Sequence, residues 1–181
     1  MNTKKIMAPT LSVRELTALD ISYIVKYWTE ADPENLSRMG ADPCKLPSKD
    51  ALQNALTTQI AQDYRDKYAY ATIWLLDGEP IGHCNVNRIE FGESAYMHLH
   101  IWESDHRTKG MGEQFCRMSI PLFFKNLELQ TLYCEPNAGN QGPNRTLKNL
   151  GFDFVKNWVT TPGDICFEQE VNLWKLEKSQ N

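Results

Sequence analysis

The sequence predicts an α+β fold, with a mixed, mostly antiparallel central sheet of about six to seven strands flanked by about four helices. The first observation is the order of hydrophobic periodicities, which reads β-α-α-β-β-β-α-β-α-β-β. The second is a run of three strand-like segments joined by short turns, which is typical of antiparallel neighbours. The third is size, because 181 residues, 41% of them hydrophobic, suit one domain with one core. We expect one domain over residues 1–181, with a flexible N-terminus at 1–9 and a tail at 177–181.

The first third of the chain predicts one strand followed by two helices. Residues 11–13 alternate as in a strand with one buried face. Thr17 and Asp20 have the spacing of a helix cap. The apolar residues that follow share one helical face: Ile21, Ile24, Val25 and Trp28. The stretch 32–47 is rich in Pro, Gly, Asp and Asn, which predicts a loop with at most a short helical turn. Ser48 then caps a second helix.

The middle of the chain predicts three antiparallel strands. Residues 68–76 (YAYATIWLL) are aromatic and β-branched, the sequence DGEP makes a turn, and residues 81–91 return. A Gly-Glu pair then turns the chain into residues 94–102 (SAYMHLHIW). In this third strand His98 and His100 alternate with apolar residues, so the two imidazoles are expected to share one face.

The last third predicts two helices and three strands. A helix begins near Met111 with core residues at helical spacing, and Pro121 is expected to kink or shorten it near its end. Residues 129–135 form a strand, and the next helix starts at Gly142-Pro143 and stops at Gly151. The closing strands are expected near residues 152–159 and 165–176.

Composition and charge narrow the function classes. The net charge of -4 and the pI of about 5.6 leave no basic field for nucleic acid, and a small cationic or amine partner suits this charge better. No apolar run approaches the ~20 residues that span a bilayer, and Pro9 and Arg14 interrupt the N-terminal segment before a signal-peptide core could form. The cysteines are scattered, which favours reduced thiols over a metal site or disulfides. We therefore expect a cytoplasmic protein that uses no metal and contacts neither nucleic acid nor membrane.

The segment HRTKGMGEQF, residues 106–115, carries the strongest chemical signal. Its lysine precedes the glycine, whereas a P-loop needs Gly-Lys-Ser/Thr, and Phe115 stands where a dinucleotide fingerprint has its third glycine. A strand-to-helix junction with Arg107 and two glycines still suits an anion, because unpaired N–H groups and the helix dipole point outward there. The alternative is a plain turn in which Gly110 and Gly112 only relieve backbone strain.

The same loop fills the signature [R/Q]-x-x-G-x-[G/A] without a gap. The residues are Arg107, Thr108, Lys109, Gly110, Met111 and Gly112, between the predicted fourth strand and third helix. In this the chain resembles the GNAT superfamily of acetyl-CoA-dependent N-acetyltransferases, and its element order matches the family's from about Leu11 to Leu176. In the family the backbone amides of this loop hold the pyrophosphate of coenzyme A. The resemblance therefore implies acetyl-CoA as co-substrate.

A second segment supports the resemblance. Asn140 precedes Gly151-Phe152 in a way similar to the family's N-x-x-A-x-x-L-Y-x-x-x-G-F segment, whose Asn commonly contacts the pantetheine arm. With Arg145 downstream, the spacing is similar to the branch of siderophore and aminoglycoside 6′-N-acetyltransferases, and Arg145 joins the implied cofactor-binding residues. RimJ/RimL-like protein acetyltransferases are close competitors. Family members are often dimers, so the resemblance also allows a homodimer.

The resemblance further implies where the reacting groups lie. The thioester oxygen is expected to accept a backbone N–H at the end of the fourth strand, near His100 to Trp102, which includes Ile101. His98 and His100 are the candidate bases, because an imidazole that titrates near neutrality can take a proton from an ammonium. Glu103 is the next candidate. The alternative roles are packing on the sheet for the histidines and a solvated loop carboxylate for Glu103.

One position departs from the family pattern. Leu147 stands where many members carry a Tyr that protonates the departing thiolate, so another group or solvent has to supply that proton. Tyr133 could donate it, although a strand tyrosine is more often core or sheet surface. Cys134 could suggest an acyl-enzyme, although a small buried hydrophobe is the more common role.

These features predict an enzyme that moves an acetyl group from acetyl-CoA to a primary amine or hydroxylamine of a small molecule, by direct attack in a ternary complex. One alternative is a protein N-terminal or Lys acetyltransferase of RimJ/RimL type. Another is a non-catalytic acyl-CoA-binding module. The acceptor stays open, because the first helix, the stretch 32–47 and the closing strands carry no transferable motif.

Overall fold

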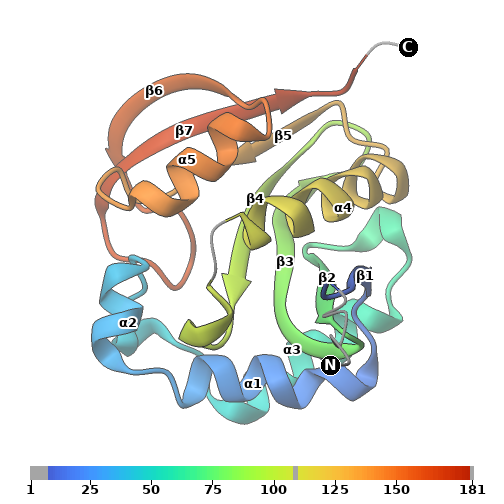
Figure 1. The fold of residues 1–181 in the computed structure, drawn as a ribbon. Coiled ribbons are helices and arrows are strands. Elements are labelled where there is room, and N and C mark those ends of the chain that lie inside the picture. Colours follow the sequence, from blue (N-terminus) through green and yellow to red (C-terminus); the bar gives the residue numbers. More distant parts are fainter. Residues whose placement is uncertain (1–7, 108–109, 180–181) are drawn as a thin grey trace, which may run out of the picture.

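A computed structural model describes residues 8–107 and 110–179 of the chain. Within this part, seven strands form one sheet in the order β1-β2-β3-β4-β5-β7-β6 (Figure 1). Neighbouring strands are antiparallel except β4 and β5, which are parallel, so the predicted mixed and mostly antiparallel sheet is confirmed. The strands are β1 (Leu11–Glu15), β2 (Tyr70–Leu76), β3 (Glu79–Glu90), β4 (Ser94–Ile101), β5 (Thr131–Cys134), β6 (Asp153–Thr160) and β7 (Gln169–Glu177).

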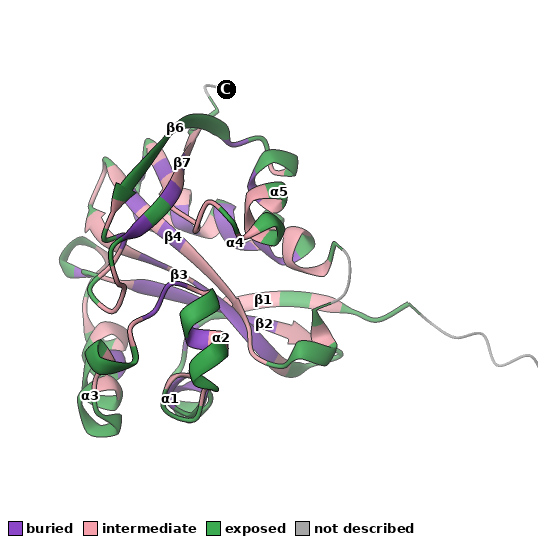
Figure 2. Cartoon of the chain, turned by 90° about the vertical axis from the view of Figure 1, so that its left-hand side faces the viewer, coloured by how far each residue is buried: buried purple, intermediate pink, exposed green. Residues whose placement is uncertain are grey.

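Five α-helices in the described part cover the two faces of the sheet, one more than the sequence suggested. They are α1 (Ile21–Thr29), α2 (Pro33–Arg38), α3 (Lys49–Ala61), α4 (Met111–Asn126) and α5 (Gln141–Asn149). Helices α1 and α3 pack together on one side, and α4 crosses the other side over β1, β3 and β4 and contacts α5 (Figure 2). None of the helices described is both long and apolar enough to cross a membrane.

The two faces of the sheet receive different side chains because strand residues alternate. On β3, Cys84 and Val86 point toward α4 and join a large core that includes Phe115. Their neighbours His83 and Asn85 point the other way and line a cavity beneath α1 and α3. The apolar cluster on that second side is smaller: Leu16, Ile21, Ile24, Val25, Leu56, Ala71 and Ile73.

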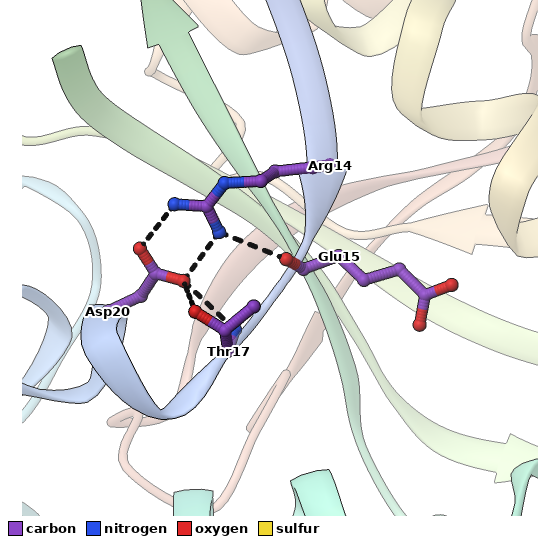
Figure 3. A network of polar contacts seen from close by, with 4 residues as sticks. All are labelled: Arg14, Glu15, Thr17 and Asp20. Atoms are coloured by element: carbon purple, nitrogen blue, oxygen red, sulfur yellow. Dashed lines mark hydrogen bonds and ion pairs between the residues drawn. The ribbon is translucent and has the colours of Figure 1, made fainter. Parts of the chain in front are cut away.

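A buried carboxylate fixes the start of α1 against β1. Asp20 is 1% exposed, and the guanidinium of Arg14 donates to its two oxygens at 2.6 and 2.8 Å. The N–H and the hydroxyl of Thr17 donate to the same carboxylate at 2.9 and 2.7 Å (Figure 3). Burial by itself raises the pKa of Asp20, but these hydrogen bonds and the charge of Arg14 outweigh it and hold the pKa below its usual range. The predicted start of the helix at Thr17 and Asp20 is confirmed.

The segment 32–47 contains more helix than its composition suggested. Asp32 begins α2 and Asp42 begins a short 3-10 turn, and each side chain accepts a backbone N–H, at 3.0 and 2.9 Å. A proline follows each aspartate, at a helical position where a missing N–H does no harm. An Asp-Pro pair is therefore a helix-start signal that loop-like composition conceals.

Pro121 was expected to kink or shorten α4 near its end, and it does not shorten it. The helix continues to Asn126. Pro121 lies on the exposed side, whereas Ile120 and Phe123 are buried against the sheet. The carbonyl that loses its donor belongs to Arg117, which is also exposed, so water can satisfy it while the buried side stays packed.

Two predicted helix boundaries are confirmed. Ser48 caps α3, and its Oγ accepts the N–H of Ala51 at 3.2 Å. Helix α5 ends before Gly151, whose φ of 86° favours glycine, and the N–H of Phe152 returns to the carbonyl of Leu147 at 3.1 Å.

The last strand begins later than expected, at Gln169 instead of residue 165. The residues before it fold toward α2, where Cys166 and Ala41 form an isolated β-bridge. The side chain of Gln169 donates to a carbonyl of the segment 40–42 at 3.0 Å. Two stretches far apart in the sequence, 40–42 and 165–167, therefore lie side by side above the sheet.

Candidate active site

Two cavities open on the sheet and meet at two histidines. The larger cavity, of about 260 Å³, lies between the sheet and helices α1 and α3. The smaller cavity, of about 110 Å³, lies where β4 and β5 separate, beside the start of α5. His98 and His100 line both cavities, together with Met39 and Cys166. The two residues expected to act as bases therefore stand at the junction.

Polar side chains form the floor of the larger cavity. His83 pairs across the strands with His100, and Asn85 pairs with His98, so alternate residues of β3 and β4 present polar groups on one face. The rings of His83 and His100 stack with centroids 4.7 Å apart. The sequence reasoning did not select His83. Its alternation with buried Cys84 on a strand adjacent to the other histidines is the signal that could have found it.

Hydrogen bonds indicate which nitrogen of each ring carries the proton. His98 Nε2 lies 3.1 Å from Asn87 Oδ1, which can only accept, so the proton belongs on Nε2 and Nδ1 keeps its lone pair. His100 Nδ1 lies 3.2 Å from the hydroxyl of Tyr27, which in turn donates to Met39 Sδ at 3.1 Å. With this assignment His100 donates from Nδ1 and keeps the lone pair on Nε2. Each ring then has one nitrogen able to accept a proton.

Both histidines are neutral at physiological pH. Burial, with a smaller contribution from Arg88, lowers the pKa of His98 to about 4. Burial also lowers the pKa of His100 well below its usual range, and the nearby His83, His98 and Arg107 add to the effect. The expectation that these imidazoles titrate near neutrality is therefore wrong, because the surrounding protein removes them from water. They are weak bases that are always in the proton-accepting form.

The separation of β4 and β5 leaves backbone groups of β4 without a strand partner. The two strands pair over three residues, and β5 then ends at Cys134. The N–H of Trp102 donates to the carbonyl of Ile81 at 3.0 Å, and backbone direction alternates along an antiparallel ladder. Leu99 and Ile101 therefore direct their N–H groups away from β3, into the gap. The Trp102 N–H is occupied, so within the expected range from His100 to Trp102 the N–H of Ile101 is the one left to donate to the thioester oxygen.

The loop before α4 has the geometry of an anion site. Gly110 caps the helix in the left-handed conformation, with φ of 84°, and a Cβ on Gly112 would meet only the side chain of Ile101, at 3.9 Å. The space over Gly112 is therefore open to a ligand that approaches the first backbone N–H groups of the helix. Arg107 is exposed, and its guanidinium donates to the carbonyl of Ile101 at 3.2 and 3.3 Å. The two other loop residues expected to bind cofactor, Thr108 and Lys109, lie outside the described residues.

Comparison with models of known protein families assigns the chain to a family. The family model of the acetyltransferase (GNAT) domain matches residues 10–153. The chain belongs to the GNAT acetyltransferase family. The resemblance carried by residues 107–112 is thereby confirmed at the level of the family.

Solved structures share the fold of this GNAT chain. It is similar to a RimL ribosomal L7/L12 alpha-N-protein acetyltransferase in complex with coenzyme A, at 14% identity and a TM-score of 0.75, over 93% of this chain and 94% of that one. It is similar to a spermidine N-acetyltransferase from Vibrio cholerae with coenzyme A and spermine, at 18% identity and a TM-score of 0.74, over 92% and 95%. It is also similar to the aminoglycoside acetyltransferase AAC(6')-Ib with coenzyme A, at 17% identity and a TM-score of 0.69, over 93% and 95%. A search of curated proteins found no match.

The remaining expected cofactor residues of this GNAT chain lie on or just before helices α4 and α5. Asn140 precedes α5, lines the smaller cavity, and makes no capping bond with its side chain. Met111 begins α4 and is partly buried against the core. Arg145 is exposed on α5 and lines neither cavity. Their roles stay predictions.

Of the residues considered for the acid or covalent role, Cys134 alone lines one of the two cavities, the smaller one. Leu147 is fully buried in the core. Tyr133 stacks on Tyr96 with centroids 5.2 Å apart and lines neither cavity. Cys134 is 4% exposed, its thiol donates to the carbonyl of Met97 at 3.0 Å, and burial raises its pKa. This thiol is protonated at neutral pH, which supports its role as a small hydrophobe over that of a nucleophile.

Glu103 does not line the cavities where His98 and His100 lie. It is exposed and lines an outer hollow with Trp102 and Arg107, away from both cavities. This position fits a solvated loop carboxylate. Over residues 8–107 and 110–179, no group of three His, Cys, Asp or Glu side chains is placed to hold a metal ion.

Proposed function

We propose that this GNAT protein transfers the acetyl group of acetyl-CoA to a primary amine or hydroxylamine of a small molecule, by direct attack in a ternary complex. The observation that carries the proposal is the junction of the two cavities at His98 and His100. We call the larger one the acceptor cavity and the smaller one the donor cavity. Two substrates held in adjoining spaces can react with each other without a covalent enzyme intermediate.

The start of α4 and the donor cavity would together hold coenzyme A. The backbone N–H groups at the start of α4, left open by Gly110 and Gly112, would hold the pyrophosphate, with Arg107 beside them. Asn140 would contact the pantetheine arm, and the N–H of Ile101 would donate to the thioester oxygen. Acetyl-CoA supplies an acetyl group on a thioester, whose C–S bond breaks as the new C–N bond forms.

His98 and His100 would accept the proton that the amine nitrogen loses. Both rings line the junction, and each keeps one nitrogen that is free of the hydrogen bonds to Asn87 and Tyr27. Because the pKa of His98 is about 4, the ring would hold the proton only briefly and pass it to solvent, and the amine has to arrive unprotonated. Solvent would protonate the thiolate, since Leu147 offers no hydroxyl. We therefore expect kcat/KM to rise with pH as the amine loses its own proton, with no step from a histidine near neutrality.

Two alternatives are tested with the proposal. The RimL neighbour acts on a ribosomal protein, so a protein N-terminus or Lys is a rival acceptor. The bridge between residues 41 and 166, which roofs the acceptor cavity, favours a small molecule. A non-catalytic module would bind acetyl-CoA without turnover.

We also propose that the protein acts in the cytoplasm, because its five cysteines are unpaired. A homodimer stays a prediction.

The first experiment measures acetyl-CoA binding by calorimetry in the wild type and in Gly112→Ala. The added methyl fits the protein but stands where the phosphate would approach, so we expect at least about tenfold weaker binding. Gly163→Ala is the matched control, because its Cβ meets only Cys166 Sγ at 3.7 Å and lies on the acceptor side. It should leave the affinity for acetyl-CoA unchanged. A wild type that fails to bind acetyl-CoA at millimolar concentration would refute both the enzyme and the binding module.

The second experiment measures free thiol released from acetyl-CoA over a panel of amines and peptides. Release with small amines supports the proposal, and release with peptides alone favours the protein acetyltransferase. Binding without any thiol release favours the silent module.

A further inference from the structure

The walls of the acceptor cavity are almost entirely apolar. They come from α1, α3, the segment before α3 and the back of the sheet, with Ile24, Trp28, Leu46, Leu52, Leu56 and Ala71 among them. The floor is polar but uncharged, since His83, Asn85 and His98 are neutral groups. An apolar cavity of about 260 Å³ favours a ligand body that buries hydrocarbon.

Among the residues that line this cavity, Asp164 is the one carboxylate, and it lies at the mouth. It is exposed, and its oxygen is 3.4 Å from the hydroxyl of Tyr68. Glu135, the one carboxylate among the residues that line the donor cavity, is already paired with Arg88 at 3.1 Å. A ligand with several ammonium groups would therefore have to leave water without matching partners, which costs several kcal/mol for each unpaired charge.

Of the charged side chains near the cavity, the positive ones lie outside its lining. Burial lowers the pKa of His98 and of His100, with a smaller contribution from Arg88 on the first and from Arg107 on the second, and Arg88 is itself paired with Glu135. Lys45 donates to the carbonyl of Cys166 at 2.7 Å, at the roof. These cations supply no partner for an ammonium group, although the whole chain is acidic.

We propose that the acceptor is a primary amine on a compact apolar body with no second charge, and that polyamines and aminoglycosides are poor acceptors. This inference rests on the proposed function, because it assigns the acceptor cavity to the amine. The amine enters with its hydrocarbon against Trp28 and the leucines of α3, and its nitrogen reaches the junction at His98 and His100.

The test compares linear monoamines of increasing length with diamines of equal length, for example 1-aminohexane with 1,6-diaminohexane. Thiol release gives kcat/KM, and calorimetry in the presence of coenzyme A gives the amine affinity. We expect kcat/KM of the monoamines to rise about threefold to fourfold per added methylene until the cavity is filled. At equal length we expect the diamine to be at least about tenfold poorer in both readouts.

A pair of variants tests the electrostatic cause. Leu52 lies in the cavity wall near the start of α3, where a carboxylate is well tolerated. Leu52→Glu should raise the preference for the diamine at least about tenfold relative to the isosteric Leu52→Gln, because only the former adds a charge.

The outcomes separate this inference from the proposed function. Diamines that match or exceed monoamines in kcat/KM would overturn the apolar acceptor and leave acetyl transfer intact. Monoamines that bind with the expected preference but release no thiol would support the ligand class and refute the catalytic proposal. Acetylation of peptides without any monoamine turnover would overturn the inference in favour of a protein acceptor.

Discussion

The two faces of strands β3 and β4 differ although they are made of alternate residues of the same strands. Toward α4, side chains such as Cys84 and Met97 are fully buried, and the ring of Trp74 stacks on Phe115 with centroids 5.0 Å apart. Toward α1 and α3, His83 and His98 line a cavity. The face toward α4 is packed against the helix, whereas the face toward α1 and α3 leaves a cavity. The comparison shows how one sheet provides both a packed support and a reactive surface.

The difference also indicates where stability and activity reside. The core cluster on the α4 side includes Phe115, Phe123, Leu132 and Leu147, all fully buried. The cluster under α1 and α3 is smaller and shares its face with the polar floor. Substitutions on the first face should therefore change mainly the free energy of unfolding, and substitutions on the second mainly the rate of acetyl transfer.

The largest expected effect is on the packed face. Phe115→Ala removes a fully buried ring that stacks on Trp74, and it should lower the free energy of unfolding by about 3–5 kcal/mol. Urea unfolding measures this value. Phe124→Ala, at a partly buried ring on the same helix, serves as the control and should cost clearly less. Equal losses in the two variants would show that the packed face is not organised as described.

A second substitution tests whether a residue on the packed face can take part in acetyl transfer. Leu147→Tyr restores the residue that many GNAT members carry, but Leu147 is fully buried here. The larger ring should overpack the core and cost about 1–3 kcal/mol without raising kcat. Thermal unfolding and thiol release measure the two effects. A gain in kcat would mean that position 147 reaches the donor cavity.

A third substitution tests the anchor between α1, which covers the reactive face, and β1. Asp20→Asn weakens the pairing with Arg14, and because Arg14 is 39% exposed we expect a modest loss of about 1–2 kcal/mol at pH 7. The pKa of Asp20 is lowered in the folded state, so its stabilising effect is present above the unfolded value of about 3.9 and is lost as pH falls through the folded value. Urea unfolding of both proteins at several pH values should show the difference shrinking only in acid. A difference that is constant down to the acid limit would contradict this account.

The smallest expected effect concerns the neutral histidines. His83 is buried and its pKa is lowered to about 3, so between that value and the unfolded value of about 6.5 the unfolded chain binds more protons. Stability should therefore fall as pH decreases below neutrality. Between pH 7.5 and 6.0, His83→Gln should reduce this loss by about 0.5–1 kcal/mol in urea unfolding. An unchanged slope would show that His83 is not kept neutral by burial.

Much of the fold could be predicted from the sequence because its signals are local. The alternation over residues 94–102 and the caps at Ser48 and Gly151 each depend on a few neighbouring residues. Helix α2 is more than the short helical turn allowed for this stretch, because loop-like composition outweighed its Asp-Pro start signal. The start of the last strand was placed too early because the pairing of Cys166 with Ala41 is a long-range contact.

The candidate site could be predicted only in part. His98 and His100 were found because both lie on one strand, whereas His83 lies on the neighbouring strand and joins them through strand register. Their neutral state follows from burial under helices, which no local pattern reports. Glu103 follows the same strand by only a few residues, yet the chain carries it outward to solvent.

The central claim is that the polar face performs the reaction while the packed face holds the fold. The most direct measurement is kcat for thiol release with 1-aminohexane in the His98→Ala/His100→Ala double variant, together with its free energy of unfolding. We predict that kcat falls at least about 100-fold, while the unfolding free energy falls by less than the loss of about 3–5 kcal/mol expected for Phe115→Ala. A double variant that keeps a kcat close to that of the wild type would contradict the account.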